Sequence, residues 1–251
     1  MPQQPSVVVQ QEGPLLHMRL NRPERRNAID GAAAKELLTA LQTLEKRPDL
    51  RVGILSGEGT GFCSGMDLDD FRTSGAPPAL ESLYLLPRTK PLVCAVEGFA
   101  IAGGFELALM SDILVAAADA VFALPEVCVG LVGWRGIASL AATLPPQAAS
   151  LIALTGTRVD APLLHSWGIV SVIAEPGTAL STAITWATTV ADQAPLAVGA
   201  SRELITVAPR LGEDEFRERA LLNAHALLDS QDAQEGATAF LERRAPRWKG
   251  C

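Results

Sequence analysis

The sequence has few of the residues from which metal, redox and nucleic-acid sites are built. Its three histidines lie far apart without a metal-ligand spacing, and its four cysteines show no paired spacing typical of zinc sites or redox pairs. The net charge is −7 and the basic residues are scattered, which argues against nucleic acid as a partner. Carboxylates and backbone amides remain to carry chemistry, so we expect no metal site. We expect most of the cysteines to be small core residues in a reducing compartment: Cys63, Cys94, Cys128 and Cys251.

Long apolar runs are also missing. No run reaches membrane-spanning length, and the first residues, Met1-Pro-Gln-Gln-Pro5, lack the charged start and apolar centre of a secretion signal. We therefore expect a cytoplasmic protein with no membrane partner. With 251 residues, of which 48% are hydrophobic and 20% charged, the chain can bury one large core.

What the sequence does contain is a strand, a glycine turn and a helix in succession. An apolar run after Pro91 leads into Ala102-Gly-Gly104, and a helix-like spacing of apolar residues follows as far as Asp112. Amides at the start of a helix have no intrahelical partner, so they suit an oxygen that develops negative charge. Glu106 is placed to act on whatever the turn holds, although a purely structural glutamate here would only complement the helix dipole.

The rest of the pattern alternates strands with helices, which favours an α/β core. We predict a hairpin over residues 6–20, a helix capped by Asp30, and strands over residues 52–56 and from Ile113 and Val121 onward. Residues 69–89 have the composition of a mobile loop leading into a short helix, and they could form a lid. Pro125-Glu126-Val127 resembles the first turn of another helix, where a glutamate is a common structural feature. From Gly136 onward the pattern is mostly helical.

Several motifs in order give the chain a resemblance to the enoyl-CoA hydratase/isomerase family, also called the crotonase family. The resemblance covers nearly the whole length, from Asn21-Arg-Pro-Glu-Arg-Arg-Asn-Ala28 to the basic tail. Gly61-Phe-Cys-Ser-Gly-Met-Asp-Leu68 is similar to the family's first oxyanion segment, and Ala102-Gly-Gly-Phe-Glu-Leu-Ala-Leu109 to the second. Phe122-Ala-Leu-Pro-Glu126 is similar to its second acid segment. Together these motifs are highly specific.

The resemblance implies an α/β fold with a spiral of ββα units. We expect a crotonase core over residues 1–190 and a C-terminal helical region over residues 191–251 that forms a trimer or a dimer of trimers and contacts coenzyme A. The implied oxyanion-hole amides belong to Met66 and Gly103, and the implied catalytic residues are Glu106 and Glu126. The implied substrate contacts fall on Arg25, Arg26, Ala28, Ser64, Asp67, Leu68, Trp134 and Arg243. No cofactor is implied, because coenzyme A is part of the acyl-CoA substrate.

The implied reaction is the hydration of an enoyl-CoA, which would make the protein a lyase. A thioester carbonyl held by two amides becomes a better electron sink. Water can then add across the 2,3-double bond if one carboxyl group deprotonates it while another gives a proton to the α carbon. Like charges at close range in a partly dry site would raise one carboxyl pKa and keep that proton available.

The sequence departs from the family after the second acid. Hydratases usually continue with a Pro-Gly-Ala-Gly-Gly-like loop that helps to place the water, whereas this chain reads Val132-Gly-Trp-Arg-Gly136. Either Trp134 narrows the pocket and Arg135 pairs with a glutamate and lowers its pKa, or both point outward at a subunit contact.

Three hypotheses therefore stay open. The first is a 2-enoyl-CoA hydratase that uses both glutamates. The second is a double-bond isomerase, or another crotonase-type acyl-CoA enzyme, that works with Glu126 alone. The third is a largely non-catalytic acyl-CoA-binding protein whose site is blocked by Trp134 and Arg135. Retention of both glutamates favours the first hypothesis over the second.

Overall fold

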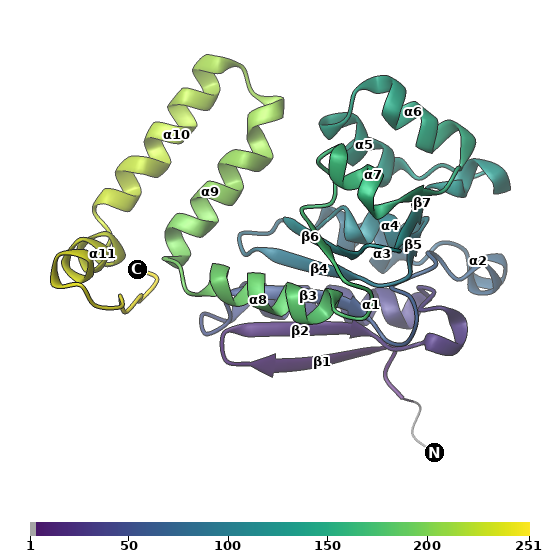
Figure 1. The fold of residues 1–251 in the computed structure, drawn as a ribbon, viewed down its shortest axis with the longest axis horizontal. Helices are drawn as coiled ribbons and strands as arrows, with labels where there is room; N and C mark the ends of the chain where they lie inside the picture. The colour runs from purple at the N-terminus through teal and green to yellow at the C-terminus, as the bar shows by residue number, and fades with distance from the viewer. Residues whose placement is uncertain (1–3) are drawn as a thin grey trace.

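The computed structural model describes residues 4–251 and is built around a six-stranded, mostly parallel sheet (Figure 1). The strand order is β1-β2-β3-β4-β6-β9, in which only β1 and β2 pair antiparallel. The bounds are β1 Val7–Glu12, β2 Leu15–Leu20, β3 Val52–Gly57, β4 Leu92–Val96, β6 Ile113–Ala117 and β9 Val172–Ala174. The predicted N-terminal hairpin is confirmed, with Val7 opposite Leu20.

Both faces of this sheet are buried at the central strands β3 and β4, since their successive side chains point to opposite sides and almost all of them are buried. On one face, Ile54, Val93 and Val115 pack against α8 (Ala179–Ala191), whose buried side chains are alanines at every fourth position. Small side chains at this helical spacing let α8 lie close to the sheet. The opposite face, which includes Leu55, packs under α1 (Gly31–Lys46).

A second sheet has three strands, two of which directly precede the segments that hold the glutamates. Its order is β5-β7-β8, with bounds β5 Phe99–Ile101, β7 Val121–Ala123 and β8 Val159–Asp160. Two isolated bridges, between Cys63 and Ala100 and between Ile29 and Met66, attach residues 61–66 to the edge of β5 and to the segment before α1. Residues 61–66, which belong to the predicted first oxyanion segment, are therefore held between two other parts of the backbone.

The helices occupy the faces and one end of the molecule. Besides α1 and α8, they are α2 Leu68–Ser74, α3 Pro78–Leu85, α4 Gly103–Ala108, α5 Trp134–Thr143, α6 Pro146–Thr155, α7 Ala161–Ser166, α9 Pro195–Val207, α10 Glu213–Leu228 and α11 Gln231–Glu242. Short 3-10 helices are η1 Pro23–Arg25, η2 Pro125–Val129 and η3 Ala208–Arg210. Asp30 caps α1 as predicted, since its Oδ1 accepts the amide of Ala33 at 2.8 Å.

Three sequence predictions need correction. Residues 69–89 are mainly helical, because α2 and α3 occupy most of the expected loop. The turn at Pro125 is a 3-10 helix and not the start of an α-helix, whereas the second half is mostly helical as predicted and holds only two short strands within the described residues, β8 and β9. Only two cysteines, Cys63 and Cys94, are buried, whereas the other two are exposed.

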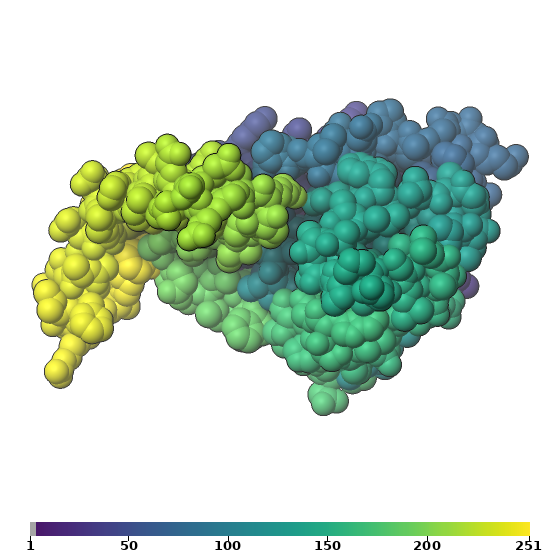
Figure 2. All heavy atoms as spheres, turned by 90° about the horizontal axis from the view of Figure 1, so that it is seen from above, coloured from purple at the N-terminus to yellow at the C-terminus, as the bar shows by residue number. Residues whose placement is uncertain are grey.

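Helices α9, α10 and α11 project from the core, as Figures 1 and 2 show. They expose large apolar side chains, namely Ile205, Leu221, Leu222, Leu228, Phe240 and Leu241. None of the helices within residues 4–251 combines the length and the apolar composition that crossing a membrane requires.

Candidate active site

Two backbone segments meet closely at the carboxyl ends of β4 and β5. Gly65 has φ +97°, a conformation that favours glycine, and a Cβ there would lie 2.8 Å from the Cβ of Ala102 and 3.1 Å from the nitrogen of Gly103. A Cβ at Gly103 would lie 3.6 Å from the nitrogen of Met66. The amides of Met66 and Gly103, which the sequence predicted as a pair, are thus neighbours across this contact.

Both of these amides are free to bind an oxygen. Within residues 4–251, neither the Met66 nor the Gly103 nitrogen donates a hydrogen bond to a protein acceptor. The residue before Gly103, Ala102, is held at φ 53° and ψ −128° by its own amide, which donates to Ala123 at 2.9 Å, and by its carbonyl, which accepts from Glu106 at 3.0 Å. Such a conformation costs a non-glycine residue free energy, so the surrounding hydrogen bonds fix the direction of the next peptide.

The predicted first oxyanion segment, residues 61–68, is held from outside by ion pairs. Nη2 of Arg22 lies 3.1 Å from Oδ2 of Asp67 and 3.1 Å from Oδ2 of Asp30. Asp67 also caps α2 by accepting the amides of Asp69 and Asp70. Asp67, for which the resemblance implies a substrate contact, thus also holds the Met66 turn in place.

Glu106 lies in the first turn of α4 and is 7% exposed. Its Oε1 accepts the amide of Gly136 at 2.9 Å, and Gly136 lies in the first turn of α5. A helix begins with amides that have no intrahelical acceptor, so the carboxylate satisfies one of them. The hydrogen bond orients one oxygen of Glu106 and leaves the other for chemistry.

Glu126 lies on η2 and has a different environment. Its Oε2 is buried and has no hydrogen-bond partner among the described residues. Burial raises the pKa of Glu126 to about 7, and the nearby charge of Glu106 adds to the increase. One of the two glutamates can therefore hold a proton near neutral pH.

The loop over residues 132–136, which departs from the family pattern and is called the altered loop below, lies close to both glutamates at its glycines. A Cβ at Gly133 would lie 2.8 Å from Oε1 of Glu126, and a Cβ at Gly136 would lie 3.2 Å from Cγ of Glu106. The bulky residues lie between these two positions. Trp134 is 47% exposed, and its ring packs edge to face on that of Tyr84 with 6.2 Å between the ring centroids. Arg135 forms no ion pair with either glutamate among residues 4–251, which disagrees with the alternative in which it pairs with one of them.

Tyr84 is a site residue that the sequence reasoning missed. It lies near the end of α3, is buried, and donates its hydroxyl to the carbonyl of Gly103 at 3.3 Å. Its position within Leu80-Glu-Ser-Leu-Tyr84 gives an i, i+3, i+4 apolar face, which is the signal of a helix packed on the core. That signal could have placed the residue inside rather than in a mobile loop.

The remaining predicted contacts, apart from Arg243, lie on or beside the chain segments that hold Met66. Arg26 and Asn27 both have positive φ, and the carbonyl of Arg26 accepts the amide of Ser64 at 3.0 Å. Ala28 is buried beside them and Leu68 is largely exposed. Arg243 follows α11, a helix that Figure 1 shows at the far end of the molecule, so one chain alone does not bring it to the segment of Met66.

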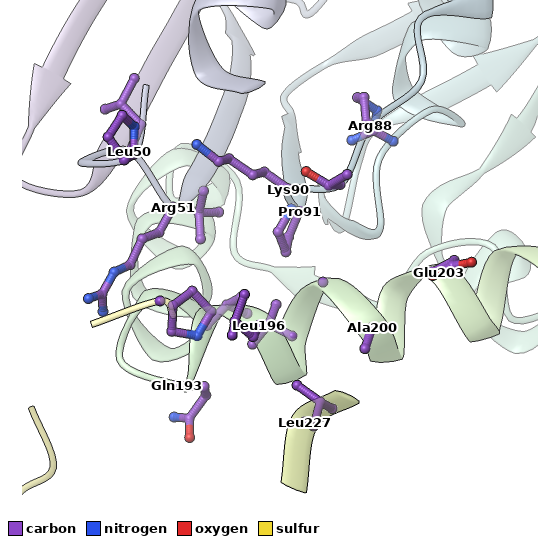
Figure 3. A pocket seen from close by; sticks show the side chains of 18 of the residues that line it. Leu50, Arg51, Arg88, Lys90, Pro91, Gln193, Leu196, Ala200, Glu203 and Leu227 are labelled. Carbon is purple, nitrogen blue, oxygen red and sulfur yellow. The ribbon is translucent and has the colours of Figure 1, made fainter. Parts of the chain in front are cut away.

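A cavity of about 550 Å³ lies elsewhere, between the core and α9 (Figure 3). It is lined by Arg51, Lys90 and Pro91, which precede β3 and β4, and by Leu196 and Ala200 of α9. It therefore opens at the amino ends of the parallel strands, whereas the free amides and glutamates lie beyond their carboxyl ends. Ligands of parallel α/β sheets bind at the carboxyl ends, so we assign the chemistry to the glutamate site.

Comparison with known proteins gives one consistent result. A model of the enoyl-CoA hydratase/isomerase family matches residues 10–251. The chain is 36% identical over 260 residues to carnitinyl-CoA dehydratase of Salmonella arizonae, covering 98% of each protein. It is also 36% identical over 253 residues to carnitinyl-CoA dehydratase of Citrobacter koseri, covering 95% of this chain and 96% of that protein.

Solved structures agree over a similar span. A crystal structure of enoyl-CoA hydratase from Mycobacterium tuberculosis is 40% identical with a TM-score of 0.93, covering 99% of this chain and 100% of that one. An enoyl-CoA hydratase from Polaromonas sp. JS666 is 34% identical with a TM-score of 0.91, covering 97% of this chain and 99% of that one. The predicted α/β fold is thereby confirmed.

Proposed function

The chain belongs to the enoyl-CoA hydratase/isomerase (crotonase) family, and within that family of enzymes we propose that it adds water across the 2,3-double bond of a 2-enoyl-CoA thioester. One observation carries the proposal. Two glutamates contact the same short segment at the start of α5, and the pKa of one of them, Glu126, is raised to about 7. A pair of carboxyl groups that shares one proton can act as base and acid in the same reaction.

The proposed reaction begins at the two free amides. The thioester oxygen accepts hydrogen bonds from Met66 and Gly103, and these bonds strengthen as negative charge moves onto that oxygen. Electron density is drawn from the double bond, so the β carbon becomes electrophilic. Glu106 takes a proton from water as the water oxygen bonds to the β carbon. Glu126 then delivers its proton to the α carbon, and the charge on the oxygen returns to the double bond of the carbonyl.

The geometry of the altered loop supports catalysis over a blocked site. Two glycines of this loop, Gly133 and Gly136, approach the glutamates closely, although the loop differs in sequence from the family pattern. Trp134 turns its ring toward Tyr84 rather than replacing a glycine contact. We therefore infer that Trp134 forms an apolar wall beside the acyl group.

The direct test is to mix purified protein with crotonyl-CoA. We expect the absorbance of the conjugated thioester to fall and 3-hydroxybutyryl-CoA to accumulate. The matched control is the Glu106→Gln/Glu126→Gln double variant, which should bind without turnover. Formation of a shifted double bond instead of the hydroxy product would favour the isomerase, and tight binding without any product would favour the binding protein.

The names of the relatives favour a second substrate in the reverse direction. Proteins similar to this chain are named carnitinyl-CoA dehydratase, and dehydration of a 3-hydroxyacyl-CoA is the reverse of hydration. A half-exposed indole such as that of Trp134 suits a quaternary ammonium group through a cation–π contact. Carnitinyl-CoA should therefore be assayed beside 3-hydroxybutyryl-CoA, and a preference for the former that disappears in Trp134→Leu would support this candidate.

Gly133→Ala should lower hydration by about tenfold or more, because a misplaced catalytic group loses rate steeply with distance. The new methyl group would lie 2.8 Å from Oε1 of Glu126, so the carboxyl group must move. The measurement is kcat with crotonyl-CoA. Gly212→Ala is the matched control, since a Cβ at Gly212 meets no atom within 4 Å. Equal rates for both variants would show that Glu126 does not act from its observed position.

Arg26→Ala should weaken binding of a CoA ester about threefold to tenfold more than binding of the truncated pantetheine ester. Arg26 is exposed and forms no ion pair within residues 4–251, whereas Arg25 already lies 3.4 Å from Asp69. Binding of both esters to Arg26→Ala and Arg25→Ala should be measured at low and high salt. We expect the smaller effect for Arg25→Ala and a difference that shrinks with salt. Equal losses for both esters would exclude a phosphate contact.

We also propose that the protein assembles as a trimer or a dimer of trimers. The support is the exposed apolar surface of the three C-terminal helices, which a monomer would leave in water. In such an assembly Arg243 of one subunit could reach the nucleotide on another. Sedimentation of the purified protein at the mass of a monomer would contradict this proposal.

A further inference from the structure

Tyr84 places its hydroxyl group beside the open side of Gly103. A Cβ at Gly103 would have three nearest atoms, namely the Tyr84 hydroxyl at 3.3 Å, the Met66 nitrogen at 3.6 Å and the Cα of Gly65 at 3.7 Å. Glycine has no Cβ, so no side chain of its own fills this space. The hydroxyl therefore borders the same small space as the free amide of Met66, next to the residue that carries the other free amide.

The protein itself holds the proton of this hydroxyl only weakly. Its hydrogen bond goes to the Gly103 carbonyl at 3.3 Å, whereas bonds between a hydroxyl and an oxygen are usually about 2.5–3.0 Å long. Tyr84 is 8% exposed, and burial raises its pKa well above the ordinary value, so the hydroxyl keeps its proton at neutral pH. Such a proton can turn to a stronger acceptor that enters the same space.

Trp134 keeps the ring of Tyr84 in this place. The two rings pack edge to face, with 84° between their planes. Trp134 belongs to the altered loop, so this contact ties the altered loop to Gly103 through Tyr84. A ring that is already fixed presents its hydroxyl to a ligand without a further loss of rotamer freedom.

We propose that the Tyr84 hydroxyl is a third hydrogen-bond donor to the thioester oxygen, in addition to the amides of Met66 and Gly103. The proton turns from the Gly103 carbonyl to the thioester oxygen when the ligand binds. The new bond then strengthens as negative charge develops on that oxygen, because an ionised acceptor makes the stronger hydrogen bond. Most of the gain therefore falls in the transition state. This role rests on the proposed binding of an acyl-CoA thioester at the two amides.

Tyr84→Phe removes the hydroxyl and retains the ring that packs on Trp134. We expect kcat/KM for crotonyl-CoA to fall about tenfold to a hundredfold, the scale of a lost hydrogen bond to a charged group. Affinity for butyryl-CoA should change less than about threefold, since its carbonyl carries little charge. Ser82→Ala is the matched control, because it removes an exposed hydroxyl of the same helix that donates to the Pro78 carbonyl. Equal kcat/KM values for the two variants would overturn the proposal.

The contact with the thioester can be measured without turnover. Butyryl-CoA labelled with carbon-13 at its carbonyl gives an infrared band whose frequency falls as the oxygen accepts more hydrogen bonding. We expect the bound band to lie below that of the free ligand, and to move part of the way back in Tyr84→Phe but not in Ser82→Ala. A band at the wild-type frequency in Tyr84→Phe would contradict the contact.

A third measurement uses the protein without substitution. Tyr84 is the single tyrosine of the chain, so a carbon-13 label at Cζ gives one protein resonance. We expect this resonance to move when butyryl-CoA binds and to move much less with S-butyl-CoA, a thioether that lacks the carbonyl oxygen. Equal shifts with both ligands would overturn the proposal. If crotonyl-CoA is not hydrated while the band and the resonance respond as expected, the proposed hydration fails and the Tyr84 contact stands.

Discussion

Replacing either glutamate with glutamine is expected to lower hydration of crotonyl-CoA by about a hundredfold or more, the usual scale for a lost general acid or base. Glutamine cannot deliver a proton from position 126, and it cannot take one from water at position 106. Binding of butyryl-CoA, which has no double bond to hydrate, should change little in either variant. The measurements are kcat, KM and the affinity for butyryl-CoA.

The two substitutions also separate hydration from isomerisation. A hydratase needs both carboxyl groups, whereas an isomerase can move a proton between carbons with Glu126 alone. If Glu106→Gln leaves turnover intact while Glu126→Gln abolishes it, the isomerase replaces the hydratase. A loss of activity in Glu126→Gln should not come from a loss of stability. Burial disfavours the ionised form of Glu126, so at pH 8 the Tm of Glu126→Gln should equal or exceed that of the wild type.

The protonation of Glu106 and Glu126 also determines how kcat/KM should depend on pH. Hydration starts with the proton on Glu126 and ends with it on Glu106, so both directions need a pair that carries one proton. Because the pKa of Glu126 is about 7, kcat/KM for hydration should fall as pH rises through about 7. Addition of water consumes no proton overall, so the dehydration profile must show the same alkaline limb. The residual activity of Glu126→Gln should lack this limb.

The sequence predicted those parts of the site that depend on local chemistry. A strand followed by Ala102-Gly-Gly104 and a helix indicated free amides, and the amide of Gly103 is indeed without a protein acceptor among the described residues. The family motifs added Met66, and the structure brings its amide next to Gly103. The alternation of strands and helices likewise predicted the α/β core.

Contacts between distant segments could not be predicted in the same way. Tyr84 meets Gly103 only because α3 packs into the hydrophobic core, and the polar residues around it gave the segment a loop-like composition. Arg135 and Trp134 lie next to glycines that contact the glutamates, but the direction of each side chain depends on how α5 begins. A change of one residue at the start of a helix turns a side chain by about 100°. The sequence therefore left open whether this loop blocks the site.

Gly103→Pro is expected to reduce kcat/KM by about a hundredfold to a thousandfold, because it removes one of the two amides that stabilise the developing negative charge. Gly103 is the first residue of α4, a position where proline is tolerated since its missing amide would have no intrahelical partner. The helix should therefore survive the change. The amide of Met66 remains and accounts for the residual rate.

Gly103→Ala is the control that isolates the amide. It adds a Cβ 3.6 Å from the Met66 nitrogen and 3.3 Å from the Tyr84 hydroxyl, as proline does, but it keeps the N–H group. The ratio of the two rates then measures the loss of the N–H group together with the effect of the proline ring carbon that replaces its hydrogen. Affinity for butyryl-CoA should differ between the variants by much less than kcat/KM does, because the ground-state carbonyl carries little of the charge that the amide stabilises. Equal kcat/KM values for the proline and alanine variants would mean that the Gly103 amide does not bind the thioester oxygen.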